Sequence, residues 1–361
     1  MKKMYYFAAA ALLLMASCSK EEILEQSKEA KIAFNVLSDN AVTRATPVTS
    51  ANLTSADFKV WAFTGTTKYM RGVQIKHNGT KWDYANALDV YYWPSSALNI
   101  YAVSPAVHTN LTRGFGTSSA LNFTYTASET NTEQADVMYA SKLNFSKPGD
   151  ATVPLKFKHA LSQIVFKGKA ASAMTVRIKS IKVHNLKKSG TFTFPAAETA
   201  DGSAQGSWAL TGTADADYVV GTVSNPPMNE ATINGATLTD LTKSDGVLLV
   251  LPQTATKWTT TEGAAVPITT ADTNNQCYLE IELKLSVNGV FLIGGTGYDK
   301  VYVPFGGTAW EAGKKYIYTL NFGGGYKDDG TVMLTPMKFE PTVEEWGDSP
   351  ADIVLPPAPA P

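Results

Sequence analysis

Cys18 is the residue whose position most directly indicates chemistry. Two lysines stand near the start of the chain, residues 5–15 are almost wholly apolar, and Ala16 and Ser17 precede the cysteine. A charged start, a short apolar run and small residues form a secretory signal that is removed from the mature protein. We predict that residues 1–17 are cleaved off and that the Cys18 thiol then receives lipid, as at a bacterial lipobox. The alternative is an ordinary signal peptide that happens to contain a cysteine.

Side chains able to support catalysis or metal binding are scattered elsewhere. The four histidines are widely spaced, and no pair has the spacing of metal ligands. We expect His159, in an apolar run, to be a hydrogen-bonded structural residue, and Cys277, on an apolar face, to be inert core. Glu344 and Glu345 are adjacent, so in a strand they face opposite ways. The sequence predicts no enzyme, no metal site and no cofactor.

The composition excludes several classes of partner. Charged residues are 17% of the chain and the formal net charge is -1, so no field attracts nucleic acid. If Cys18 carries lipid, Cys277 has no partner and an intrachain disulfide cannot form. Hydrophobic residues are 44% of the chain, and tyrosine and tryptophan are frequent. These values are typical of a globular, β-rich protein.

Two-residue alternation predicts strands along most of the chain. The segment 277–287 is the clearest, with six apolar residues on one face. After Val176 and Ile178 the alternation resumes at Ile181 and Val183 with a one-residue shift, as a β-bulge allows. No long segment shows a capped 3.6-residue period. We therefore predict an all-β protein built from antiparallel sandwiches.

Turn-rich residues 146–150 separate two apolar stretches and indicate a domain boundary. This boundary gives an N-terminal sandwich over residues 45–152 and a C-terminal sandwich over 153–346. The alternative is a long hairpin loop within one domain. Residues 347–361 form a proline-rich tail, which we expect to be extended or disordered.

Several local phrases, taken in order, resemble the fimbrillin family of Bacteroidetes, which comprises the type V pilins and their Mfa-like relatives. No single phrase is decisive, but together they cover most of the chain from about residue 30 to 346. The phrases are FKVWAF at 58–63, YYWP at 91–94, YAVSP at 101–105, QADVMYA at 134–140, LKFKHALSQIVFK at 155–167, VYVPFGG at 301–307, GKKYIYTLNFG at 313–323 and VEEW at 343–346.

The resemblance implies two tandem transthyretin-like sandwiches and a structural subunit of a surface fimbria, without catalysis. It also implies a lipidated precursor in the outer membrane. An arginine-specific protease would remove its first strand, and a donor strand from another fimbrial subunit would fill the vacated groove. The expected location is the cell outer membrane for the precursor and then the fimbrium.

The resemblance assigns these roles to residues 18–44, the expected pro-segment. Ile32, Phe34 and Val36 alternate on one side of a short strand, which suits a placeholder that plugs a sandwich. Arg44 is the only arginine before Arg71, so we expect the cut between Arg44 and Ala45. The alternative is an exposed loop arginine without a role.

The donor strand has two candidate positions near the C-terminus. One is the segment 337–346, with Phe339 and Val343 as its apolar positions, although Pro341 weakens it as a central strand. The other contains Ile353 and Leu355. A further interpretation is that 337–346 only closes its own C-terminal sandwich.

A monomeric surface lipoprotein that binds glycan or a host ligand is the alternative function. Surface tryptophans could stack on sugars, although tryptophans in a β-sandwich are more often part of the core. The tryptophans considered are Trp82, Trp93, Trp208, Trp258 and Trp310.

Overall fold

Strands account for nearly all regular structure, as predicted for an all-β chain. The computed structural model describes residues 30–38, 57–115, 121–199, 204–222, 230–243, 246–260, 266–322, 325–326, 329, 332–333 and 338–345. Helix in these residues is limited to α2 (Ile268–Thr273) and the 3-10 turns η3 (Ala87–Asp89) and η4 (Asn131–Glu133). In the part of the chain described here, no helix has the length and apolar character needed to cross a bilayer.

Seven strands of the N-terminal half form a closed sheet. The first strand completes it, because it pairs with the last one in parallel. In spatial order the strands are β1 (Ala33–Ser38), β4 (Trp82–Tyr84), β3 (Thr67–His77), β2 (Phe58–Thr64), β5 (Leu98–Ser104), β8 (Met138–Phe145) and β9 (Thr152–His159).

The closed sheet is apolar on both faces where it meets the rest of the molecule. Along β2, Val60 and Ala62 point into the closed sheet, whereas Trp61 and Phe63 belong to the core outside it. A strand covered on both sides needs apolar residues at successive positions, which explains the continuous run in β2. The sheet therefore has its own interior core and also contributes to a larger one.

A four-stranded sheet covers part of that outer face. Its aromatic residues form the contact: the rings of Phe123 and Phe192 stack with centroids 4.7 Å apart, and Tyr139 of β8 lies 4.5 Å from Phe192. In spatial order the strands are β13 (Ser207–Thr211), β12 (Ser189–Thr193), β7 (Leu121–Thr126) and β6 (Leu111–Phe115).

Two further sheets form the C-terminal half and share the outer core with the N-terminal half. One contains β16 (Thr239–Asp240), β10 (Ser162–Ala170), β21 (Lys314–Phe322) and β24 (Lys338–Glu345), with β17 (Leu248–Val250) also paired to β10. The other contains β14 (Ala216–Val219), β11 (Met174–Leu186), β18 (Tyr278–Val287), β20 (Asp299–Pro304), β22 (Gly325–Tyr326) and β23 (Val332–Met333). In it, β15 (Ala231–Asn234) pairs with β11 and β19 (Val290–Ile293) pairs with β18.

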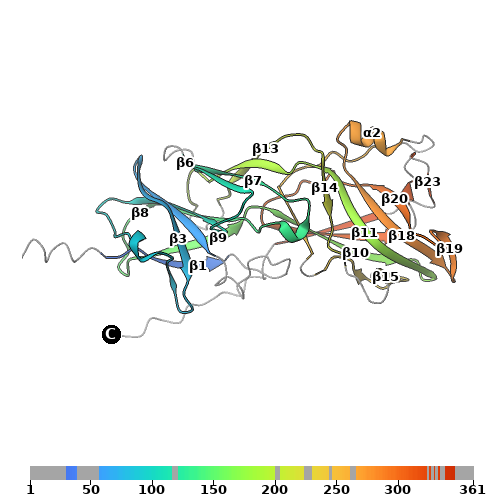
Figure 1. Cartoon of the computed structure of the whole chain (residues 1–361), viewed down its shortest axis with the longest axis horizontal. Coiled ribbons are helices and arrows are strands. Elements are labelled where there is room, and N and C mark those ends of the chain that lie inside the picture. Colours follow the sequence, from blue (N-terminus) through green and yellow to red (C-terminus); the bar gives the residue numbers. More distant parts are fainter. Residues whose placement is uncertain are drawn as a thin grey trace, which may run out of the picture.

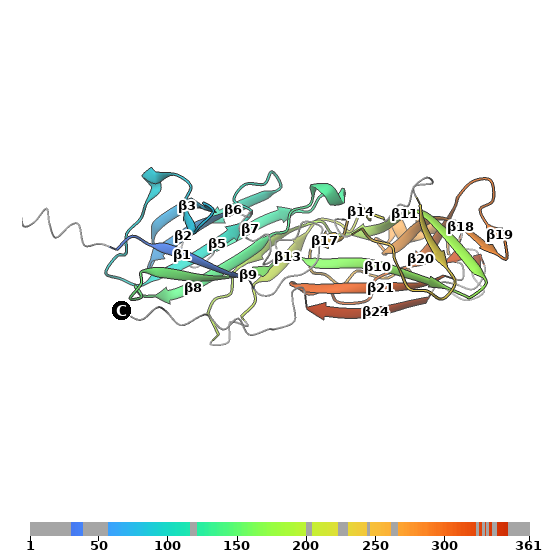
Figure 2. The ribbon, with the colours of Figure 1, turned by 90° about the horizontal axis from the view of Figure 1, so that it is seen from below.

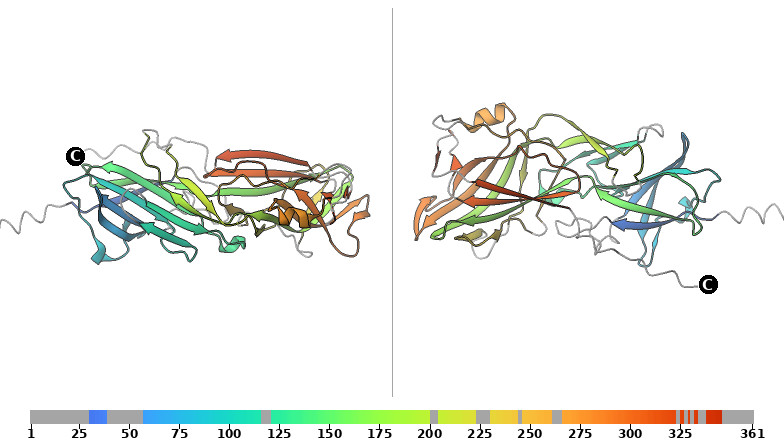
Figure 3. Two further views of the ribbon diagram at one scale, coloured as in Figure 1. Left: turned by 90° about the horizontal axis from the view of Figure 1, so that it is seen from above. Right: turned by 180° about the vertical axis from the view of Figure 1, so that it is seen from behind.

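The molecule is elongated. Figure 1 shows β1, β3 and β8 towards one end of the long axis and β18, β19 and β20 towards the other. Figure 2 shows β10, β21 and β24 lying side by side in one layer. In both views of Figure 3 the blue N-terminal strands and the orange C-terminal strands lie towards opposite ends of the long axis. The first strand is thus far from the C-terminal sheets.

The structure confirms one detail of the alternation and corrects another expectation. The pairing of β11 with β18 shifts register between Ile178 and Ser180, which is the predicted bulge. The expectation of antiparallel sheets is wrong at two places, because β1 pairs with β9 in parallel and β10 pairs with β21 in parallel. Parallel neighbours require long connections, and more than a hundred residues separate the partners in each pair.

The strand order also bears on the domain division, which remains a prediction. β9 begins where the expected boundary falls, yet it pairs with β8 and β1 in the closed sheet. β12 and β13 lie beyond that boundary and pair with each other and with β7. The N-terminal half therefore includes strands from both sides of residue 152.

Candidate functional site: the slot of the first strand

The candidate site is the β1 slot, which we define as the space between β9 and β4 that β1 occupies. β1 pairs with β9 from the Ala33–Thr152 position to the Ser38–Phe157 position. Its other side has one register position with β4, where Phe34 lies opposite Trp82. Most of the strand pairing of β1 is therefore made on one edge.

Three alternating side chains, from β1 and the residue directly before it, point into the closed sheet. Ile32, Phe34 and Val36 are buried, whereas Asn35 between them is exposed. The Phe34 ring lies edge-on to Phe58, with centroids 6.4 Å apart, and to Tyr84 at 6.0 Å. Aromatic side chains therefore surround the Phe34 ring in the interior of the closed sheet.

Phe58 makes further aromatic contacts in the interior of the closed sheet. The Phe58 ring lies 5.0 Å from Phe157 of β9 and 5.2 Å from Trp82 of β4, measured between centroids. Rings from both walls of the slot thus meet beneath β1. Edge-to-face pairs of this kind add about 0.5–1.5 kcal/mol beyond the area that they bury.

Backbone groups ahead of the strand are held by the segment that follows η3. Ile32 N donates to Tyr91 O at 2.9 Å, and Trp93 N donates to Ala30 O at 2.9 Å. The buried Trp93 also donates from Nε1 to Ala151 O at 2.8 Å. Residues 91–93 therefore clamp the entry of β1 against the start of β9.

Two polar side chains mark the mouth of the slot. Lys31 Nζ lies 2.6 Å from Asp83 Oδ1 and 5.0 Å from the centre of the Tyr84 ring. The hydrogen bond from Lys31 lowers the pKa of Asp83, and burial raises the pKa of Tyr84. The Tyr84 hydroxyl stays protonated and donates to Ile32 O at 3.1 Å.

Sequence analysis gave no role to Tyr84 and considered Trp93 only for sugar stacking or as part of the core, although both residues hold β1 in place. The available signal was the YYWP phrase at 91–94, which served only for the family resemblance. A short aromatic phrase gives no indication of which distant backbone its indole will reach. The link between Trp93 and Ala151 is visible only in the tertiary structure.

The C-terminal candidate segment lies at a sheet edge. β24 contains Phe339 and Val343 and pairs antiparallel with β21 from Asn321–Lys338 to Lys314–Glu345. The Val343 side chain is 53% exposed, and Pro341 fits because one side of an edge strand makes no ladder bonds. In this structure the segment closes the edge of its own sheet.

The remaining predicted positions have different outcomes. Cys18, Arg44, Ala45, Ile353 and Leu355 lie outside the described residues. Their assigned roles stay predictions.

The structural roles expected for two side chains are confirmed. His159 is buried, with Nδ1 2.9 Å from Asp136 Oδ1. Cys277 is also buried, and burial raises the pKa of its thiol, which keeps the thiol in its unreactive protonated form. Of the tryptophans considered for sugar stacking, Trp82, Trp93, Trp258 and Trp310 are buried and Trp208 is partly buried.

Catalytic or metal-binding groupings would require polar residues to converge. Among the described residues, no group of three or more histidine, cysteine, aspartate or glutamate side chains could hold a metal ion. The slot instead combines an apolar interior with backbone pairing. This arrangement defines a class of site that binds an extended segment as a strand.

Comparison with known proteins gives the family. A family model described as fimbrillin-like matches residues 43–346, and the search of curated proteins gave no match. A fimbrial protein from Bacteroides vulgatus has a similar fold, with 12% identity and a TM-score of 0.58 over 88% of this chain and 99% of that chain. The fimbrial anchor protein Mfa2 from Porphyromonas gingivalis is 9% identical, with a TM-score of 0.37 over 88% of this chain and 99% of that chain.

Because the family model spans most of the sequence, the chain belongs to the fimbrillin-like family. Proteins of this family are structural and adhesion proteins, and they are not known as enzymes. Membership supports a role as a fimbrial subunit at the cell surface.

Proposed function

We propose that this chain is the precursor of a structural subunit of a surface fimbria, assembled by exchange of β1 for a donor strand. The observation that carries the proposal is the place of β1. It completes the closed sheet through parallel pairing with β9 and buries three alternating side chains. Since β1 is the first described strand of the chain, one cut behind it would free it from the fold.

The free energy available in the slot suits a lasting joint between subunits. Burial of each inward side chain contributes about 1.5–3 kcal/mol as an upper estimate, and each ladder hydrogen bond adds about 1 kcal/mol. Association costs at least about 4 kcal/mol in lost freedom of motion. A donor of similar quality to β1 therefore binds with net stabilisation.

A tethered β1 excludes such a donor until the chain is cut. The link through residues 39–57 keeps β1 near the slot at an effective concentration in the millimolar range or above. An external strand of equal quality cannot displace it under those conditions. Cleavage after Arg44 removes this advantage and leaves Ala45 as the new N-terminus.

The rest of the proposal concerns the precursor. Signal removal and lipidation at Cys18 would anchor it in the outer membrane, and cleavage would release the subunit into the fimbrium. We propose further that the two halves are tandem transthyretin-like sandwiches. The core that runs from the outer face of the closed sheet into the C-terminal sheets would make them one rigid rod.

For the donor we propose β24 rather than the segment around Ile353 and Leu355. Phe339 and Val343 are an even number of positions apart, as Phe34 and Val36 are, although their spacing is four residues rather than two. β24 is an edge strand, and its residues 341–344 are exposed. An edge strand in antiparallel pairing is thus available to a neighbour.

The test is the N-terminal residue of subunits recovered from intact filaments. The proposal predicts Ala45, and it predicts that Arg44→Ala abolishes filaments while the precursor still folds. Arg71→Ala is the matched control, because Arg71 lies within β3 and its loss should leave assembly unchanged. Filaments whose subunits still contain residues 33–38 would contradict strand exchange.

A further inference from the structure

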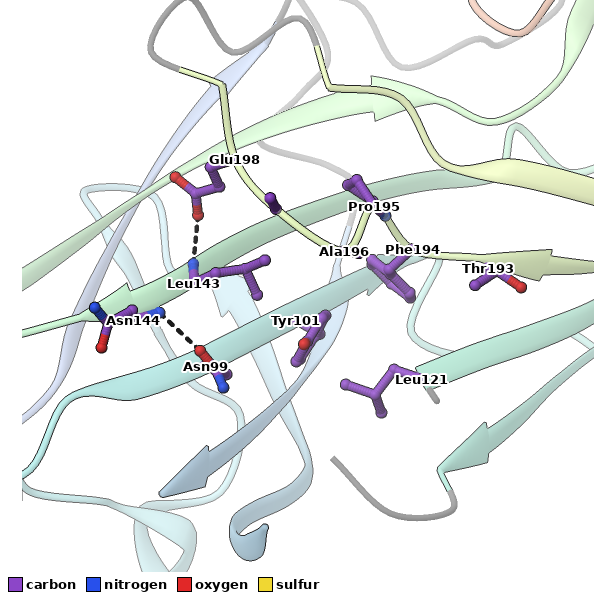
Figure 4. Close-up of a pocket in the computed structure, with 11 residues that line it drawn as sticks. Asn99, Tyr101, Leu121, Leu143, Asn144, Thr193, Phe194, Pro195, Ala196 and Glu198 are labelled. Carbon is purple, nitrogen blue, oxygen red and sulfur yellow. Dashed lines mark hydrogen bonds between the residues drawn. The ribbon is translucent and has the colours of Figure 1, made fainter. Parts of the chain in front are cut away.

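A cavity of about 730 Å³ lies on the outer face of the closed sheet, well separated from the β1 slot (Figure 4). Asn99 and Tyr101 of β5 and Leu143 and Asn144 of β8 form one side. The stretch 193–198, which leaves the end of β12, forms the other. The volume falls in the range of about 300–1,000 Å³ that is usual for small-molecule sites.

The walls of this cavity are held in place by hydrogen bonds. Glu198 accepts a hydrogen bond from Leu143 N, and its second carboxylate oxygen lies 3.1 Å from Lys142 Nζ. Asn144 N donates to Asn99 Oδ1 at 2.7 Å (Figure 4). The segment that carries Glu198 is therefore fastened across β8, and the cavity is preformed.

The charge of the lining is balanced. Among the described residues of the lining, Glu198 is the one that carries a charge, and Lys142 neutralises it. Aspartate, lysine and arginine are absent from the lining formed by the described residues. A ligand that carries a full charge finds no counter-ion here, so the chemistry favours a neutral ligand.

Polar groups without protein partners remain at the rim. Within the part of the chain that the structure describes, the Tyr101 hydroxyl and the Asn144 side-chain amide have no hydrogen-bond partner. The side-chain oxygen of Asn99 accepts a hydrogen bond, whereas its NH2 group has no partner among the described residues. Apolar atoms of Leu121, Leu143 and Phe194 lie beside them. A sugar ring matches this combination, since it has hydroxyl groups at its edge and an apolar C–H face.

We propose that this cavity binds a short neutral saccharide, with Tyr101 and Asn144 as hydrogen-bonding residues. This gives the subunit a ligand-binding role in addition to assembly. It differs from the sugar-stacking idea based on tryptophans, because the described residues that line the cavity include no tryptophan. Its failure is also distinguishable from failure of strand exchange, because the cavity lies outside the closed sheet.

The experiment uses the chain without its signal segment 1–17, so that β1 is retained. This protein is applied to an array of neutral and acidic oligosaccharides. The tightest neutral binder is then titrated by calorimetry. Tyr101→Phe removes one oxygen and should weaken binding about 3- to 10-fold. Asn144→Gly should have a similar effect, and glycine tolerates the left-handed backbone at this position, where φ is 49°.

Asn288→Gly is the matched control for Asn144→Gly. Asn288 is also exposed, has a φ of 48° and lies in the turn between β18 and β19. The control should leave saccharide affinity unchanged. The proposal is overturned if no neutral saccharide is retained, if only acidic sugars bind, or if Tyr101→Phe and Asn144→Gly bind as tightly as the parent protein. Normal filament assembly by Tyr101→Phe would show that any loss of binding is local.

Discussion

The two terminal strands of the described chain differ in how deeply they belong to the fold. β1 lies inside a closed sheet, and its Phe34 side chain is only 5% exposed. β24 lies at the edge of an open sheet, and its Val343 is 53% exposed. The two strands also differ in composition, because β1 (AFNVLS) has no charged residue whereas β24 (KFEPTVEE) has one lysine and three glutamates.

This contrast is the reason to propose β1 as the strand that a donor replaces and β24 as the strand that acts as a donor. Removing β1 exposes the rings of Phe58, Tyr84 and Phe157 to water, so the vacancy is unfavourable until another strand fills it. Along β24, residues 341–344 are exposed, so these positions lose little buried surface if the strand detaches. Under the proposed strand exchange, β1 would therefore be the strand that is replaced and β24 the strand that is donated.

The largest expected effect is at the centre of β1. Phe34→Ala should lower the free energy of unfolding of the precursor by about 3–5 kcal/mol, because the substitution leaves a cavity among aromatic rings. Denaturant titration measures this loss. Asn35→Ala, on the exposed face of the same strand, should change stability by less than about 0.5 kcal/mol. Equal losses at the two positions would mean that β1 is not a one-sided plug.

The clamp at the entry of β1 should give a smaller effect. Trp93→Phe removes the hydrogen bond to Ala151 O and should cost about 1–2 kcal/mol, since that carbonyl also accepts from Ala33 N. Trp82→Phe deletes a similar volume in the wall of the slot and isolates the packing loss. If Trp93→Phe costs no more than Trp82→Phe, the indole hydrogen bond does not secure β1.

The ion pair at the mouth should contribute less than about 1 kcal/mol, because Lys31 is 41% exposed. Its pH dependence has a defined sign. The pKa of Asp83 is lower in the folded state, so the contribution is present above the unfolded-state pKa. It is lost as the pH falls through the folded-state pKa. Unfolding measurements should show that Lys31→Met costs stability at neutral pH, and that the cost shrinks as the pH falls through the folded-state pKa of Asp83. In an Asp83→Asn background, the effect of the Lys31 substitution should no longer depend on pH in this acidic range.

The smallest effect is expected in β24. Val343→Thr keeps the shape of the side chain and should change the free energy of unfolding by less than about 0.5 kcal/mol. The same substitution at Val36 places a hydroxyl in the closed sheet and should cost about 1–3 kcal/mol. Comparable losses would remove the distinction between the two strands.

Local alternation predicted the faces of strands well. The inward set Ile32, Phe34 and Val36 was identified from the sequence, and so was the bulge near Ser180. These features depend on residues two positions apart, which the sequence displays directly. The structural roles of His159 and Cys277 followed from their apolar neighbours in the same way.

Pairing across long stretches of chain was not predictable by the same reasoning. Nothing near Phe34 indicates that its strand lies parallel to residues 152–157. The two-sided burial of β2 and the cavity beside Tyr101 likewise depend on which sheet covers which face. Such contacts reflect loop closure and the sum of core packing, which single-sequence patterns do not encode position by position.

The sequence alone determined that this protein is all-β, which family it resembles, and which side of each alternating strand is apolar. Only the tertiary structure decided that β1 closes a sheet while β24 borders one. The physical reason is that a two-residue period fixes where a side chain points relative to its own strand. The neighbours of that strand are chosen by contacts between residues far apart in the chain.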